Sequence, residues 1–300
     1  MENFSKILTA VKERPLVSLA VAAADDEELL KAVGLAEEMG LVKPILVGPA
    51  LKTEELARKA GLANFEIEPA DSPDQAAVRA VGLVRSGRAG VLMKGLVNTS
   101  VYMRAILDKE KGLRTGRLVS LLAVYELPQY PKLIFAADSG INVAPDLKQK
   151  RDILKNSLEA MRLMGFIRPK VAVLASNELV DQKIPATVEA ASLAEMAAAG
   201  EFGDCDLEGP LSLDIAFSRE AAEHKSFKSR IAGAPDLLIF PNIESGNFLG
   251  KSWLLFNQAK WAGLVLGAGA PVILGSRSDT SEIKINSIAL GCLAAGEKLI

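Results

Sequence analysis

The feature that most constrains the fold is an alternation of short apolar runs with amphipathic helical stretches along nearly the whole chain. Runs typical of buried strands lie at 17–23, 44–48, 89–93, 118–125, 132–137, 171–175, 237–240 and 271–275. Helical patterns separate them, for example at 25–40, 53–61, 72–87, 186–199, 211–225 and 281–299. Continuous apolar strands that alternate with helices predict an α/β fold, in which parallel or mixed sheets are covered on both faces.

These strands fit either one very wide sheet or two packed α/β domains. A length of 300 residues allows one large domain or two of moderate size, and we expect two packed domains. The chain has candidate crossing points near 142–145 and 276–281, and the last helix is expected to return to the first domain. We therefore predict a first domain of residues 1–143 plus 277–300 and a second of residues 144–276.

Composition narrows the classes of function. The net charge is −2 and no basic block is present, which argues against a nucleic-acid partner. The two cysteines form neither a disulfide framework nor a zinc spacing, as suits a reducing compartment. The N-terminal segment does not resemble a signal peptide. The longest uncharged run, Trp261 to Ser276, is interrupted by glycines and a proline, so neither a membrane span nor a membrane partner is expected. We expect a cytoplasmic protein.

The chain has one histidine, His224, and it lies in a charged helical segment. A surface position is the simplest interpretation. This disfavours a Ser-His-Asp hydrolase and a His-ligated metal enzyme, and no metal site is predicted.

The strand predicted at 271–275 runs directly into Ser276, Arg277, Ser278, Asp279 and Thr280, after which a helical pattern begins. Backbone N–H groups and the positive end of a helix dipole suit a bound anion. A guanidinium can grip a phosphate with two hydrogen bonds. This loop therefore indicates an anion site, although a solvated loop is the simpler interpretation.

Polar, glycine-bearing loops follow three further predicted strands, and ligands in open α/β sheets bind at the carboxyl ends of strands. Helix capping explains any one of these loops by itself. Taken together, the four loops predict an anion-binding cleft. The predicted substrate-binding residues are Lys94, Asn98, Thr99, Ser100, Arg104, Asp138, Asn142, Asn242, Glu244, Gly246 and Asn247.

The segment 246–252 approaches the phosphate-loop pattern, but it is one residue short because Ser245 occupies the place of the first glycine. Its apolar Phe248 and Leu249 favour a helix already under way. No strand is followed by G-x-G-x-x-G, so a dinucleotide site has little support.

The sequence resembles the phosphate acetyl/butyryltransferase family, most closely its butyryltransferase members, along most of the chain. The segments that carry the resemblance are 92–100, 107–116, 142–147, 236–247 and 276–279. It implies two α/β domains in an isocitrate/isopropylmalate dehydrogenase-like arrangement with the site in the cleft between them. It also implies a homodimer or larger oligomer.

The implied reaction is acyl-CoA + phosphate ⇌ acyl phosphate + CoA, with coenzyme A as co-substrate and no tightly bound cofactor. The Ser-Arg pair of the family corresponds to Ser276 and Arg277, and its cleft arginine corresponds to Arg104. Acetyltransferases of the family carry an aspartate where this chain has Ile283, so a base must come from Asp279, from Glu282 or from solvent. Leu121 stands where butyryltransferase-like chains often have a histidine.

We expect direct transfer in a ternary complex, because no histidine stands ready to activate a serine or cysteine nucleophile. Ser276, Arg277 and Asp279 are the predicted catalytic residues. Butyryl is the first candidate for the acyl group and acetyl is the second. The sequence is also compatible with a metal-dependent NAD dehydrogenase of the same fold and with a non-catalytic CoA or acyl-phosphate binding protein.

Overall fold

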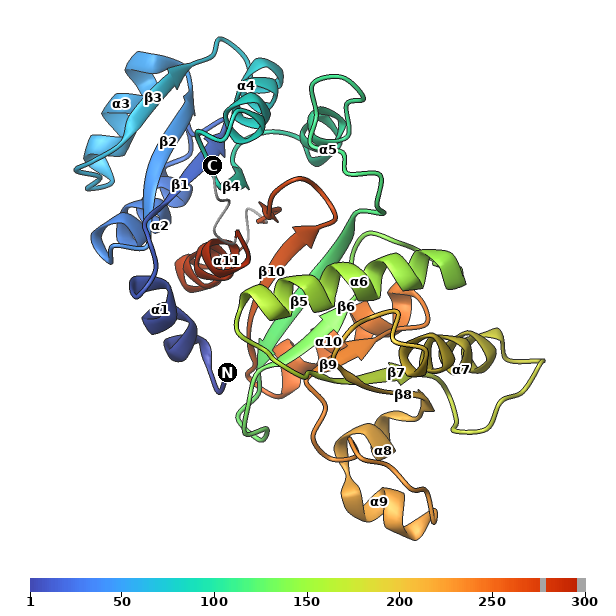
Figure 1. The fold of residues 1–300 in the computed structure, drawn as a ribbon. Coiled ribbons are helices and arrows are strands. Elements are labelled where there is room, and N and C mark those ends of the chain that lie inside the picture. The colour runs from blue at the N-terminus through green and yellow to red at the C-terminus, as the bar shows by residue number, and fades with distance from the viewer. Residues whose placement is uncertain (276–278, 296–300) are drawn as a thin grey trace. The chain divides into compact units, whose positions relative to one another are not determined.

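The computed structural model describes residues 1–275 and 279–295, and the predicted catalytic residues Ser276 and Arg277 lie outside this part of the chain. Residue contacts divide the protein into two compact units (Figure 1). One unit comprises 3–117 together with the chain from Ala262 onward, and the other comprises Leu118–Trp261.

The first unit contains a sheet in the order β3-β2-β1-β4-β11-β10. Its strands are parallel except for β10, which pairs antiparallel with β11. Helix α11 packs against α1 and α2, while α4 packs against β1 and α5. The elements are α1 (Phe4–Lys12), β1 (Val17–Ala22), α2 (Glu27–Glu38), β2 (Val42–Gly48), α3 (Ala50–Lys59), β3 (Glu66–Pro69), α4 (Pro73–Arg85), β4 (Val91–Lys94), α5 (Thr99–Ile106), β10 (Lys260–Leu266), β11 (Val272–Ile273) and α11 (Ser281–Ala294).

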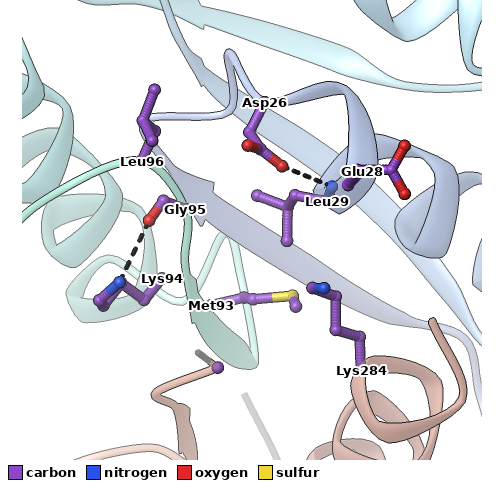
Figure 2. A pocket seen from close by; sticks show the side chains of 9 residues that line it. Asp26, Glu28, Leu29, Met93, Lys94, Gly95, Leu96 and Lys284 are labelled. Carbon is purple, nitrogen blue, oxygen red and sulfur yellow. Dashed lines mark hydrogen bonds between the residues drawn. The ribbon is translucent and has the colours of Figure 1, made fainter. Parts of the chain in front are cut away.

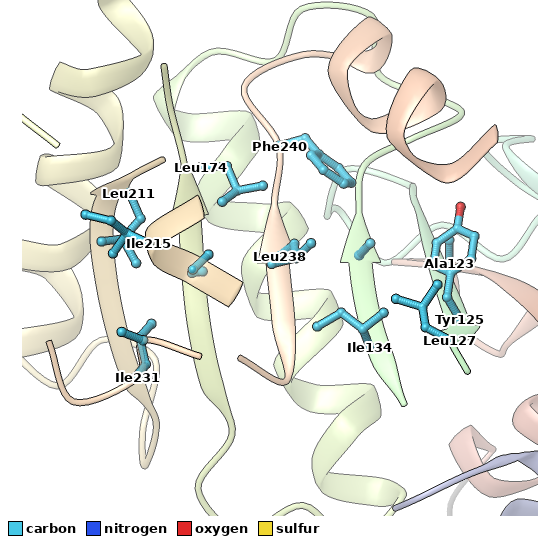
Figure 3. Packing of buried hydrophobic residues seen from close by; sticks show 14 of the residues in the cluster. Ala123, Tyr125, Leu127, Ile134, Leu174, Leu211, Ile215, Ile231, Leu238 and Phe240 are labelled. Carbon is cyan, nitrogen blue, oxygen red and sulfur yellow. The ribbon is translucent and has the colours of Figure 1, made fainter. Parts of the chain in front are cut away.

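The second unit contains strands in the order β5-β6-β9-β7-β8, parallel except for the antiparallel β5–β6 pair. Apolar side chains from these strands, from α8 and from the segment before β9 form one core, including Ile134, Leu238 and Ile215 (Figure 3). The elements are β5 (Ser120–Glu126), β6 (Ile134–Ala137), α6 (Leu147–Leu163), β7 (Lys170–Leu174), α7 (Pro185–Ala198), β8 (Asp206–Leu211), α8 (Leu213–Phe217), α9 (Arg219–His224), β9 (Leu237–Ile239) and α10 (Ile243–Phe256).

The predicted α/β class is confirmed, and local signals explain several helix ends. Ser72 accepts a hydrogen bond from Gln75 N at the start of α4, as expected of a cap followed by proline. Asp146 and Gln149 form a reciprocal capping box at the start of α6. Helix α10 ends at Phe256, before the strand β10 begins at Lys260.

The compact units change at 117/118 and 261/262, whereas the sequence suggested domain boundaries at 143/144 and 276/277. The reason lies in strand pairing. Strand β6 pairs with β9 through Ala137 and Ile239, and β5 pairs with β6, so both strands belong with the second unit.

Candidate functional site

In the first unit, the chain after β4 is fixed by close backbone contacts. Gly95 N donates to Ala22 O over 2.8 Å, and a Cβ added at Gly95 would lie 2.3 Å from Ala23 O. Only glycine allows this approach. The chain then reaches Asn98, which caps α5 without a side-chain hydrogen bond. Asn98, Thr99 and Ser100 are exposed at the start of that helix.

Strand β11 lies parallel beside β4, with Ile273 opposite Met93. Their carboxyl ends are therefore neighbours, which brings together two of the four predicted loops. Asp279, beyond the undescribed residues, is half-buried and presents its carbonyl oxygen to the ammonium of Lys284. Thr280 caps α11 by accepting from Ile283 N over 3.3 Å.

A pocket of about 110 Å³ opens at this edge of the first unit, beside the β4 end (Figure 2). Two buried lysines line it: Lys94 is 9% exposed and Lys284 is 7% exposed. Lys94 donates to Gly95 O over 3.3 Å. The remaining lining residues are Asp26, Glu28, Leu29, Met93, Gly95, Leu96 and Gly275.

Arg104 lies elsewhere on the first unit. It is exposed on α5 and lines a separate hollow of about 160 Å³ between α4 and α5. Asp74, Asp108 and Lys111 line the same hollow. Within the described part of this unit, Arg104 therefore does not line the pocket of Lys94.

In the second unit, β6 and β9 are parallel neighbours, so the loops that follow them are adjacent. Asp138 comes directly after β6 and is 2% exposed. One carboxylate oxygen accepts from the backbone N–H groups of Gly140 and Ile141. The second oxygen accepts from Leu121 N and from both the backbone and the side chain of Asn142. With five donors around it, this carboxylate holds the loop in place.

The start of α10 approaches the same loop. Asn242 caps the helix by accepting from Ser245 N over 3.0 Å. A Cβ added at Gly246 would lie 2.9 Å from the Cβ of Ser139, and the amide of Asn247 donates to Ser139 O over 3.5 Å. Glu244 is exposed in the first turn. Of the residues predicted at the start of α10, Gly246 and Asn247 thus contact Ser139.

Segment 246–252 lies inside α10, as the helical interpretation predicted. Burial raises the pKa of Tyr125, which hydrogen-bonds to Ser139, to about 12. Its hydroxyl therefore stays protonated beside the loop at neutral pH.

The sequence pattern missed Lys284 and Tyr125. Lys284 left one signal, since it is the single charged residue in the otherwise uncharged stretch 283–295. Such a residue in a buried helix must bring its charge to a partner. Tyr125 left no signal, because its role depends on the approach of α10 to β5.

No group of three or more potential metal-ligating side chains occurs within residues 1–275 and 279–295. In the same residues, no helix is both long and apolar enough to span a membrane. His224 is exposed at the last position of α9, as predicted.

Sequence comparisons with known proteins indicate one family. The model of the family described as "Phosphate acetyl/butaryl transferase" matches residues 66–292. Phosphate butyryltransferase from Clostridium acetobutylicum is 41% identical, over 99% of this chain and 100% of its own length. Phosphate acetyltransferase from Rhizobium meliloti is 38% identical, over 99% and 94% respectively.

A solved structure gives the same result. The branched-chain phosphotransacylase from Enterococcus faecalis superposes with a TM-score of 0.82 at 31% identity, covering 93% of this chain and 99% of that one. The polar strand ends described above thus stand on a fold shared with phosphotransacylases, and this chain belongs to the phosphate acetyl/butyryl transferase family.

Proposed function

We propose that this protein transfers a short-chain acyl group, butyryl first, between CoA and inorganic phosphate: acyl-CoA + phosphate ⇌ acyl phosphate + CoA. The observation that carries the proposal is the 41% identity to a phosphate butyryltransferase, which covers 99% of this chain and 100% of that protein. At similar coverage, a 38% identical phosphate acetyltransferase makes acetyl the second candidate.

We assign the phosphate to Ser276 and Arg277, and the substrate groups next to the phosphate to the loop of Lys94, Asn98, Thr99 and Ser100. Arg104 is assigned to the phosphate as well, which requires this exposed side chain to leave its separate hollow and reach the loop. The second unit contributes Asn142, Asn242, Glu244, Gly246 and Asn247, which orient the acyl and CoA portions. Asp138 acts as a positioning residue, because its carboxylate is already surrounded by donors from its own loop and from Leu121. These roles presuppose that the loops of both units face one cleft.

In the mechanism, the CoA thiolate attacks the carbonyl carbon of the acyl phosphate, the C–S bond forms, and the C–O bond to phosphate breaks. Phosphate leaves with the electron pair of that bond. Ser276 donates to the carbonyl oxygen as negative charge develops there, and Arg277 stabilises the departing phosphate. The thiol proton passes to Asp279, Glu282 or solvent, since Ile283 offers no carboxylate.

Direct transfer is supported by the state of the two cysteines. Burial raises the pKa of Cys292 to about 12, and burial also raises the pKa of the half-buried Cys205. A nucleophilic cysteine needs the opposite shift. Neither thiol is therefore prepared to carry an acyl group.

Initial rates of thiol release from acetyl-, butyryl- and longer acyl-CoAs, with and without phosphate, test the function. We expect phosphate-dependent release that is fastest with butyryl-CoA. Fastest release with acetyl-CoA would assign the protein to the second candidate. Thiol release at the same rate with and without phosphate would refute both candidate functions.

Isotope exchange tests the direct route. An acyl-enzyme would exchange labelled CoA into acyl-CoA in the absence of phosphate, whereas a ternary complex requires phosphate for exchange. We expect exchange only when phosphate is added.

We also propose a homodimer or larger homo-oligomer. The support is a set of large apolar side chains exposed on α10: Phe248 is 69%, Leu255 74% and Phe256 81% exposed. Apolar side chains clustered in this way are typical of protein interfaces. Light scattering during gel filtration measures the mass, and a 31.9 kDa species would contradict the proposal.

A further inference from the structure

Lys284 has an unusual environment for a lysine. It lies in the first turn of α11, only 7% exposed, and its side chain extends toward Met93 and Leu29 in the pocket at the β4 end (Figure 2). Its ammonium donates to the carbonyl oxygen of Asp279. Within residues 1–275 and 279–295, this ammonium has no second hydrogen-bond or ion-pair partner.

The acidic residues of the pocket are engaged elsewhere. Asp26 caps α2 by accepting from Leu29 N over 2.7 Å. Glu28 pairs with Lys31 over 2.7 Å. Neither carboxylate forms an ion pair with Lys284, so within the described residues this buried cation is paired with neither acid of the pocket.

A buried ammonium is costly unless an anion and further acceptors face it. Lys284 has three N–H donors and uses one of them on a neutral carbonyl. The 110 Å³ pocket admits a group the size of several water molecules. A tetrahedral oxyanion fits this combination of space, charge and free donors.

We propose that this pocket holds a phosphate group of a substrate and that Lys284 donates to one of its oxygens. The inference rests on the proposed function, which it makes more specific. Gly275 lines the pocket and directly precedes Ser276 in the sequence, while Asp279 closes the same loop. Through its hydrogen bond to Asp279 O, Lys284 links the loop predicted to bind phosphate with the pocket at the carboxyl end of β4.

Two substrate groups have this chemistry: the reacting phosphate and the phosphates of CoA. Titration calorimetry with inorganic phosphate and, separately, with CoA distinguishes them. The test variant is Lys284→Met, which keeps the length of the side chain and removes the charge. The control is Lys43→Met, because Lys43 is exposed at the start of β2, pairs with Glu66, and carries the same charge.

A hydrogen bond from a charged donor to phosphate corresponds to about a 10- to 100-fold change in affinity. We expect Lys284→Met to weaken binding of one ligand by this factor, with the KM for that ligand rising in parallel. Weaker binding of inorganic phosphate assigns the pocket to the reacting phosphate, and weaker binding of CoA assigns it to a phosphate of CoA. Lys43→Met should leave both affinities unchanged.

Lys284→Arg keeps the charge and is expected to restore part of the lost affinity, which a purely structural role in packing α11 would not explain. Thermal unfolding of each variant confirms that it is folded. Unchanged affinities for both ligands in folded Lys284→Met overturn the inference but leave acyl transfer intact. Conversely, Lys284-dependent phosphate binding by a wild-type protein that transfers no acyl group would refute the proposed function alone.

Discussion

At the scale of single residues, Asp138 shows how contacts separate holding a loop from binding a substrate. Its position after a strand made it a predicted ligand residue, and that position could be read from the sequence. The hydrogen-bond partners of Asp138 could not be read from the sequence, because Leu121 lies on another strand and reaches the carboxylate only after β5 and β6 pair. The polar residues at the strand ends were predictable from the sequence. The function of each side chain depends on whether other groups of the protein already fill its hydrogen-bonding positions.

Asp138→Asn should destabilise the protein. Asparagine carries no negative charge, and its side-chain NH2 group would face N–H donors that now lack an acceptor. Leaving buried hydrogen-bond donors without their charged acceptor costs about 1–3 kcal/mol. Urea denaturation measures the loss of unfolding free energy. The exposed Asp204 provides the control, because Asp204→Asn should change it by about 0.5 kcal/mol or less. Equal effects of the two substitutions would contradict the role of Asp138.

Arg277→Ala should slow acyl transfer by about 10²–10³ without unfolding the protein, as expected for the loss of one donor to developing charge. Steady-state kinetics and a thermal melt together check both parts. Arg88, exposed and paired with Glu66, serves as the matched control through Arg88→Ala. Wild-type turnover in Arg277→Ala would remove this residue from the mechanism.

At the scale of elements, the strands that the sequence missed include those at sheet edges. Strands β3 and β8 lie at the two ends of the strand order. Strand β3 contains two glutamates and a proline, and β8 contains Gly209-Pro210. Edge strands are half-exposed and accept proline, so they lack the continuous apolar run of central strands. The predicted helix at 211–225 is likewise divided, because Ser218 ends α8 and caps α9.

The sequence pattern predicted a helix from residue 53 onward, but Thr53 lies inside α3 and is fully buried. The helix begins earlier, at Ala50, after the cap position Pro49. Proline fixes a backbone angle that suits a helix start, and this signal was available in the sequence.

Helix α10 depends on glycine where it packs against Tyr125 of β5. A Cβ added at Gly250 would lie 2.2 Å from the hydroxyl of Tyr125. Gly250→Ala should therefore cost about 1–3 kcal/mol through overpacking. Gly82 in α4 is exposed with nothing within 4 Å of such a Cβ, so Gly82→Ala should stabilise by about 0.5–1 kcal/mol. Chemical denaturation should find that the two substitutions change the unfolding free energy in opposite directions. A change in the same direction for both would refute the close packing of α10 at Gly250.

At the scale of the whole molecule, the predicted site residues come from both units. The loops of Lys94 and Gly275 belong to one unit, and those of Asp138 and Asn242 belong to the other. The α/β class and these strand ends were predictable from periodicity. The division into compact units at 117/118 and 261/262 follows strand pairing, which periodicity does not encode.

Alkaline pH should destabilise the protein. Burial raises the pKa of Cys292 from 9.0 to about 12 and that of Tyr125 from 10.0 to about 12. The native state thus retains protons that the unfolded chain releases, so the unfolding free energy falls as pH rises above about 9. Urea denaturation from pH 8 to about 11 measures the slope, and Cys292→Ala should make it shallower. An unchanged slope in Cys292→Ala would contradict the contribution of this thiol.

The most direct test of the proposed function counts both products of one reaction. With butyryl-CoA and inorganic phosphate, we expect free CoA thiol and butyryl phosphate in equal amounts, and neither product when phosphate is omitted. Thiol release without butyryl phosphate, or at the same rate in the absence of phosphate, would contradict transfer of the acyl group to phosphate.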